Sequence, residues 1–168
     1  KTSLTQVSEK KSIKKEIDST TTKITLRYGL IDMNRTITGY LKGNYNDSAD
    51  KFETINGDSL TSWNNFSWNS KHYSTSIVIP SEFTSKIKTD GKKSIILDSK
   101  IHTITHVLVN ASKILTKSES NDIDAYYENG VIHLFDNTSD GYNGCSKIIY
   151  DNFENIMNIC FDLVNECD

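Results

Sequence analysis

The spacing of apolar residues changes in the middle of this chain, at its single proline, Pro80, and this change limits the possible folds more than any other feature. Before Pro80, apolar and polar residues alternate, as at Ile24, Leu26 and Tyr28, which is the period of a half-buried β-strand. After Pro80, apolar residues recur at intervals of three and four, as in an amphipathic helix. We therefore predict an α+β fold, with an antiparallel sheet in the N-terminal half and two long amphipathic helices and a hairpin in the C-terminal half.

The elements expected on either side of Pro80 follow from these periods and from the Gly, Asn and Asp residues that separate them. The predicted strands of the N-terminal half cover residues 24–28, 31–33, 37–41, 51–55, 62–68 and 73–79. The predicted elements of the C-terminal half are a short helix over 81–88, a helix over 93–115, a hairpin over 121–127 and 131–136, and a long terminal helix over 146–166. A turn is expected at Asn56-Gly57-Asp58, because Asn-Gly tolerates positive φ.

Residues 1–22 are polar and show no sustained apolar period. We therefore expect a basic arm or linker over residues 1–22 and a single α+β domain over residues 23–168. A chain of 168 residues has the length of one ordinary globular domain, and we expect that it is a segment of a longer protein.

Composition excludes several classes of protein. A net charge of -3 argues against a domain that works mainly by neutralising phosphates, and no apolar stretch is long enough for a membrane span. Three cysteines are too few for a disulfide scaffold, so we expect a reducing, cytoplasmic location. The glycines of Gly141-Tyr142-Asn143-Gly144 are not followed by the Lys-Ser/Thr of a P-loop, so we expect no ATP binding by this segment.

Two histidines, His102 and His106, lie one helical turn apart, which is the spacing that metal-binding helices use. Thr103 stands where a zinc protease would need a glutamate, so that activity is excluded. Both histidines point away from the apolar stripe of their predicted helix, and either a local polar role or a shared functional role fits them. A stand-alone metal-dependent hydrolase, in which these histidines join nearby acids, is the alternative function. The acids concerned are Asp122, Asp124, Asp136 and Asp140.

Several short motifs occur in an order that resembles a known family. These motifs are Gly39-Tyr40, Thr75 to Pro80, His102 to Leu108, Asn121-Asp122-Ile123, Ile132 to Gly144, and the helix that ends at Cys167. From about Arg35 to Asp168 the chain resembles the zinc-binding domain of the mitomycin repair factor A (MrfA) type, found at the C-terminus of superfamily-two DEAD/DEAH-box DNA helicases. The family-motif positions are His102, His106, Asp122, Asp136, Gly141 and Gly144.

The resemblance implies an accessory domain of an ATP-dependent DNA helicase that acts in DNA repair. Its expected partners are DNA and the motor domains of the same polypeptide, and no contact with a membrane is expected. This segment carries no motor motif, so alone it should not be an enzyme. The candidate nucleic-acid contacts are Lys10, Lys11, Lys14 and Lys15, together with the aromatic residues Trp63, Phe66 and Trp68, for which a place in the sheet core is the alternative.

The resemblance also implies zinc, because the terminal helix of the family runs into a cysteine cluster. Cys167 is the only metal position that this segment offers, and it is a partial site. A structural zinc needs about four ligands. We therefore expect no cofactor in this segment, and zinc if the chain continues past Asp168.

Overall fold

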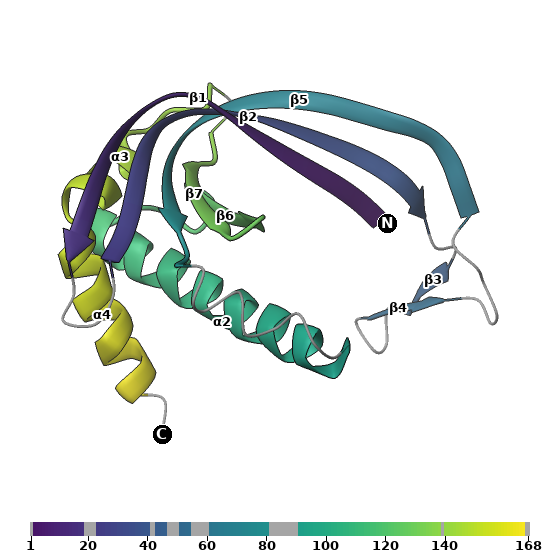
Figure 1. Ribbon diagram of the computed structural model, residues 1–168. Coiled ribbons are helices and arrows are strands. Elements are labelled where there is room, and N and C mark those ends of the chain that lie inside the picture. The colour runs from purple at the N-terminus through teal and green to yellow at the C-terminus, as the bar shows by residue number, and fades with distance from the viewer. Residues whose placement is uncertain are drawn as a thin grey trace. The chain divides into compact units, whose positions relative to one another are not determined.

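The computed structural model describes residues 2–18, 23–40, 43–46, 51–54, 61–80, 91–138 and 140–166, which form two sheets and a group of helices (Figure 1). The strands are β1 (Thr2–Asp18), β2 (Lys23–Tyr40), β3 (Gly43–Asn46), β4 (Lys51–Thr54), β5 (Thr61–Val78), β6 (Ile123–Glu128) and β7 (Val131–Asp136). The helices are α2 (Gly91–Thr116), α3 (Cys145–Asp151) and α4 (Phe153–Asn165). The strand order is β1-β2-β5-β7-β6 in one sheet and β3-β4 in the other.

The chain divides into two compact units. Unit 1 comprises Lys1–Val7 and Met33–Ser70, and it contains the antiparallel hairpin of β3 and β4, in which Gly43 pairs with Thr54. Unit 2 comprises Ser8–Asp32 and Lys71–Asp168, and it contains α2, α3, α4 and the antiparallel pairs β5–β7 and β6–β7. The site described below belongs to unit 2 alone.

The core of unit 2 forms where the helices pack on the sheet. The strands contribute Leu26 and Ile77, α2 contributes Leu108, and α3 and α4 contribute Ile149 and Phe153, all of them buried. Burial of each such side chain contributes about 1.5–3 kcal/mol relative to exposure. The α+β class predicted from the change of period is confirmed, as are the predicted helix over 93–115 and the hairpin around Asn129 and Gly130.

Residues 24–41 were expected to form three short strands, but residues 23–40 form the single strand β2. The buried positions change from the even-numbered Leu26 to the odd-numbered Ile31 and Met33. In the sequence, this shift of the apolar residues from even to odd positions looks like a break between two strands, but the strand continues through it. The predicted strands over 62–68 and 73–79 are likewise both parts of β5, which continues through the polar residues 69–72.

The predicted arm needs correction, because Thr2–Asp18 forms β1 at one edge of the five-stranded sheet. Ion pairs of Lys10 with Asp32 (3.1 Å) and of Lys14 with Glu16 (3.0 Å) lie along it. An edge strand is held by its ladder hydrogen bonds and is commonly lined with lysine, which discourages pairing with other chains. Such a strand lacks the apolar period by which sequence analysis recognises strands.

The predicted single helix over 146–166 is wrong in one respect, because it is broken at Asn152 into α3 and α4. Asn152 has φ -116° and ψ 32°, and its side-chain amide donates to the carbonyl of Ile148 (2.9 Å). An asparagine amide competes with the helix backbone in this way. The predicted helix over 81–88 and the turn at residues 56–58 lie outside the described residues.

Candidate nucleic-acid interface

The loop between β7 and α3 is built around one buried carboxylate, that of Asp136, whose side chain is fully buried. Its Oδ1 accepts the backbone N–H of Ser146 (2.6 Å), and its Oδ2 accepts those of Asn143 and Gly144 (3.1 Å each). The first residues of a helix have N–H groups without partners inside the helix. Gly144, the N-cap of α3, has no side chain to cap them, so Asp136 supplies the cap from the neighbouring strand.

Gly141 brings the same loop into contact with β5. Its φ is 72°, and a Cβ atom at this position would lie 1.9 Å from the backbone oxygen of Lys71. The carbonyl of Gly141 accepts the backbone N–H of Tyr73 (2.9 Å). His72 also reaches the loop, since its Nδ1 lies 2.8 Å from the backbone oxygen of Asp136. The conformation and position of the loop are therefore fixed by contacts that tolerate no extra atom.

The fixed loop presents Tyr142 at the surface, next to three further tyrosines. The ring of Tyr142 meets that of Tyr73 edge-on at 5.2 Å, and Tyr73 stacks on Tyr28 at 5.9 Å. Tyr28 in turn contacts Tyr150 at 5.7 Å. Tyr142 is 53% exposed and Tyr73 is 37% exposed, whereas Tyr150 is buried. Aromatic contacts of this kind are worth about 0.5–1.5 kcal/mol beyond the buried area, so the contacts with Tyr28 help to fix the exposed rings of Tyr73 and Tyr142.

Two lysines complete this surface. The Nζ atom of Lys147 lies 5.6 Å from the ring centres of both Tyr28 and Tyr150, and that of Lys15 lies 4.4 Å from the ring centre of Tyr150. Lys15 also donates to the backbone oxygen of Tyr150. We call the set of Lys15, Tyr28, Tyr73, Tyr142, Lys147 and Tyr150 the tyrosine–lysine surface.

Burial governs the ionisation of the inner tyrosines. It raises the pKa of Tyr28 to about 12, with smaller contributions from Tyr142 and Asp136, and it also raises the pKa of Tyr150. Both phenols therefore stay protonated and uncharged at neutral pH. These neutral rings offer flat aromatic faces with two cationic groups beside them, of which Lys147 also pairs with Asp151 (Nζ–Oδ1 2.5 Å, Nζ–Oδ2 2.7 Å).

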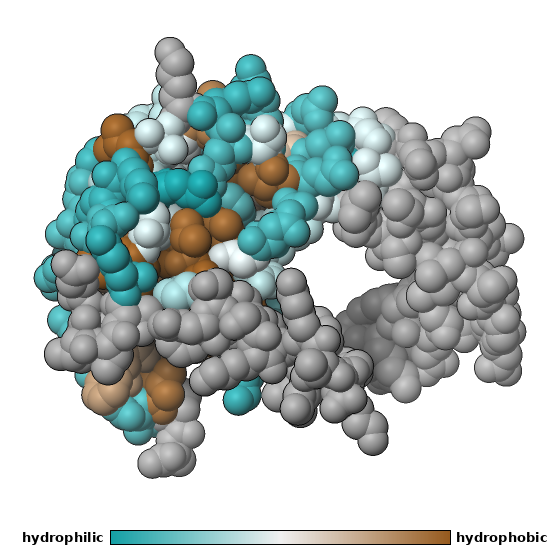
Figure 2. Space-filling view, viewed as in Figure 1, coloured by the Kyte–Doolittle hydropathy of each residue, from teal (hydrophilic) through white to brown (hydrophobic). Residues whose placement is uncertain are grey.

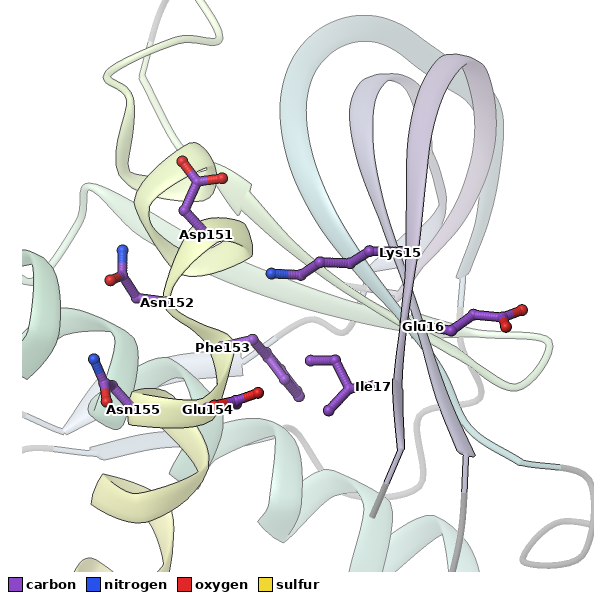
Figure 3. Close-up of a pocket in the computed structure, with 8 residues that line it drawn as sticks. All are labelled: Lys15, Glu16, Ile17, Asp151, Asn152, Phe153, Glu154 and Asn155. Carbon is purple, nitrogen blue, oxygen red and sulfur yellow. The ribbon is translucent and has the colours of Figure 1, made fainter.

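A groove of about 410 Å³ begins beside Lys15, between β1 and the junction of α3 with α4 (Figure 3). Figure 3 shows Lys15 and Ile17 reaching toward the helices, with Glu16 pointing the other way. The other lining residues are Asp151, Asn152, Phe153, Glu154 and Asn155. Asp151 and Glu154 line this groove beside Lys15, so two carboxylates against one lysine make it unfavourable for phosphate.

The lysines expected to contact nucleic acid are largely engaged elsewhere. Lys10 and Lys14 pair with carboxylates along β1, and Lys15 belongs to the tyrosine–lysine surface. The side chains of Lys11, Trp63 and Phe66 lie outside the described residues, and that of Trp68 is half-buried. The four tyrosines were missed, because they come from four separate segments that no sequence period connects. The adjacency of β2 and β5 in the sheet would have joined two of them.

The residues of the alternative hydrolase do not form one site. Among the described residues, no group of three or more His, Cys, Asp or Glu side chains is placed to hold a metal ion. His102 and His106 lie together on α2, with their Nε2 atoms 3.0 Å apart. Asp136 is enclosed by backbone N–H groups, and Asp122 accepts the N–H of Glu119 (2.8 Å). The other two acids, Asp124 and Asp140, are exposed.

The cysteines that the structure describes do not fit a zinc site. Cys145 and Cys160 are free and buried in the core cluster. Burial raises the pKa of both thiols, that of Cys160 to about 11, and so disfavours the thiolate that zinc binds. Cys167 lies outside the described residues, so zinc ligation by Cys167 stays a proposal.

The outer face of α4 exposes several apolar side chains. Met157, Phe161 and Val164 are 42%, 69% and 59% exposed, and their spacing of four and three places them on one side of the helix. Figure 2 shows hydrophobic colour over the C-terminal part of α4, at the lower left of the view. In the described part of the chain, no helix is both long and apolar enough to cross a membrane.

Comparisons with known proteins relate this fold to a helicase. No protein-family model matches the chain, and no curated protein matches it. Among solved structures, the chain is similar to the DUF1998 helicase MrfA bound to DNA, with a TM-score of 0.62 and 17% sequence identity. The match covers 99% of this chain and 21% of the helicase chain. The chain therefore has the fold of about one fifth of a DUF1998 helicase.

Proposed function

We propose that this chain is an accessory domain of a DNA helicase, which packs against the motor domains and helps to guide nucleic acid. The observation that carries this proposal is the agreement of nearly the whole chain with one part of a DUF1998 helicase. The sequence contains neither a P-loop nor an Asp-Glu-Ala-Asp box. ATP-driven unwinding would therefore belong to other parts of the helicase, and this domain would contribute binding surfaces.

The tyrosine–lysine surface is the proposed contact with nucleic acid. Unpaired bases stack on exposed aromatic rings, and each stacked base is worth about 1–3 kcal/mol. Tyr142 and Tyr73 offer exposed rings, while Lys15 and Lys147 lie beside the inner ones. Stacking of this kind needs bases outside a duplex, so the proposed ligand is a single strand, as a helicase would produce.

The outer face of α4 is the proposed contact with the motor domains. Three apolar side chains exposed on one side of a helix indicate a protein interface. The similar helicase chain is about five times as long as the part that this chain matches. A domain of that kind has neighbours in its own polypeptide, and an apolar helix face suits such a contact.

Fluorescence anisotropy with a labelled single-stranded oligonucleotide tests the contact with nucleic acid. We expect Tyr142→Ala to weaken binding by about 5-fold to 100-fold, which corresponds to the loss of one stacked base. Tyr142→Trp should retain binding, because an aromatic face remains. Lys147 pairs with Asp151 and would exchange that carboxylate for a phosphate, so Lys147→Gln should reduce the dependence of the affinity on salt by at most about one phosphate contact.

Phe161→Ala is the matched control, because Phe161 is also an exposed aromatic residue but lies on α4. This variant should bind the oligonucleotide as the original chain does. Equal binding by the Tyr142→Ala and original chains would show that the tyrosine–lysine surface is not the contact. Preference for a duplex over a single strand would contradict the stacking mechanism.

A further inference from the structure

The four histidines of this chain form two groups that differ in their surroundings. His72 and His133 are buried, and the Nδ1 atom of each lies 2.8 Å from an oxygen, the backbone oxygen of Asp136 and the hydroxyl of Ser76 respectively. His102 and His106 are exposed on α2 and face each other. The buried pair bonds neighbouring strands, whereas the Nε2 atoms of the exposed pair lie 3.0 Å apart, within hydrogen-bond distance of each other.

The geometry of the exposed pair matches two ligands of one metal ion. The Nε2 atoms lie 3.0 Å apart, and the two rings are nearly perpendicular. Metal–imidazole bonds are about 2.0–2.1 Å long, so two such bonds meeting at roughly 90–95° separate their nitrogens by about 3.0 Å. That angle is typical of neighbouring ligands in square-planar or octahedral coordination, which Cu²⁺ and Ni²⁺ prefer.

The backbone that carries these two imidazoles is held by the packing of α2 on the core. On the inner side of α2, Ile101 and Leu108 are buried in the core. Thr105, between the two histidines, is half-buried and donates its hydroxyl to the carbonyl of Ile101 (2.8 Å). A backbone fixed by packing costs little additional ordering when a metal binds, which is the requirement for a preorganised site.

We propose that His102 and His106 form a binding site for a divalent transition-metal ion that prefers nitrogen ligands, with water in its remaining positions. Cu²⁺ should bind most tightly, in accordance with the general order of affinities for such ions. With two protein ligands the site is exchangeable and leaves coordination positions open. It is independent of the proposed role in a helicase, because no residue of the tyrosine–lysine surface takes part.

Calorimetric titration of the 168-residue chain with Ni²⁺ tests the site, because Ni²⁺ does not oxidise thiols as Cu²⁺ does. We expect one Ni²⁺ per chain, and an affinity at least about tenfold lower in His102→Ala and in His106→Ala. Loss of one ligand should also abolish the Ni²⁺-dependent rise in melting temperature. Circular dichroism of each variant reports whether α2 is still folded.

A relocated pair provides the sharpest control. Asn110 is exposed and follows His106 by four residues, so His102→Ala combined with Asn110→His recreates the same spacing one turn further along α2. This variant should regain the affinity that His102→Ala loses. Failure to regain it in a folded variant, equal Ni²⁺ binding without His102, or loss of binding in Cys167→Ser would each overturn the proposal.

Discussion

The β7–α3 loop and the outer face of α4 are opposite cases within one unit. In the loop, a carboxylate is fully buried and three N–H groups bind it, so polar groups lie inside and are satisfied. On α4, Met157, Phe161 and Val164 are apolar and lie outside. The first region is completed by the chain itself, whereas the second leaves apolar side chains exposed, which is why we propose it as an interface. Stability should therefore depend on the loop, and association should depend on the helix face.

Substitution of the loop carboxylate is expected to have the largest effect. Asp136→Ala leaves three N–H groups without an acceptor in a buried position, and should lower the free energy of unfolding by about 3–5 kcal/mol. Urea denaturation measures this loss. Asp140→Ala is the control, because this aspartate belongs to the same loop but is exposed. A loss of similar size in both variants would show that the buried cap is not what stabilises the loop.

His133, which is buried on β7, should make the stability of the chain sensitive to acid. Burial, with a contribution from Arg27, lowers the pKa of His133 to about 4, whereas an unfolded histidine titrates near 6.5. The unfolded state therefore binds the proton more readily, so the contribution of His133 is complete above about pH 6.5. It is lost as the pH falls from about 6.5 toward 4, and its full size is about 3 kcal/mol.

Carboxylates titrate in part of the same pH range and affect both chains equally. The difference in the free energy of unfolding between the original chain and His133→Gln therefore isolates the contribution of His133. Glutamine can still bond Ser76 but carries no titrating group. We expect the two stability curves, measured by urea denaturation at several pH values, to converge between about pH 6.5 and 4. Parallel curves would mean that His133 is accessible enough to be protonated in the folded state.

Gly141→Ala should lower the free energy of unfolding by about 2 kcal/mol or more beyond the cost of positive φ. The added Cβ would lie 1.9 Å from the backbone oxygen of Lys71, so the backbone must be strained or displaced. Gly130→Ala is a matched control, since Gly130 also has positive φ (80°) but nothing lies within 4 Å of the added carbon. Both variants should carry the cost of positive φ, about 1–2 kcal/mol. Only Gly141→Ala should lose more, so equal losses by thermal denaturation would contradict the contact with Lys71.

A regular period made α2 predictable from the sequence, because its apolar residues face the core on one side and burial leaves a period of about 3.6 in the residue types. The β6–β7 hairpin was predictable from the turn residues Asn129 and Gly130 between two apolar runs, since β7 is buried on both faces and shows no period of 2. β1 was not predictable in this way, because its pairing along the edge of the sheet is between backbone groups, and its side chains remain polar. At the break, both the backbone N–H and the side-chain amide of Asn152 donate to the carbonyl of Ile148, and no periodicity in the sequence indicates this local arrangement.

The candidate site was less predictable than the fold. Tyr28 and Tyr150 are 122 residues apart in the sequence and meet only because β2 and α3 pack together, with β5 placing Tyr73 beside Tyr28. Asp136, Gly141 and Gly144 were recognised as motif positions, but the sequence does not reveal that the carboxylate caps α3. The sequence excluded a P-loop, because Cys145-Ser146 follows the glycines, but only the hydrogen bonds of the structure show what the loop does instead.

The smallest effect on stability is expected on the outer face of α4. Phe161→Ser and Val164→Ser should change the free energy of unfolding by less than about 0.5 kcal/mol each, because these side chains are 69% and 59% exposed. Phe153→Ala is the control on the same helix. Phe153 is 2% exposed and packs in the core, so its truncation should cost about 3–5 kcal/mol.

The same two serine substitutions should matter when the motor domains are present. In a polypeptide that carries both this domain and the motor domains, replacing Phe161 and Val164 together should lower the melting temperature of the whole protein. The apolar contact that α4 makes with its neighbour would be lost there, whereas the 168-residue chain has no such contact to lose. An unchanged melting temperature of the larger protein would assign the motor contact to a different surface. A large loss in the 168-residue chain alone would mean that α4 is completed by the chain itself, as the β7–α3 loop is.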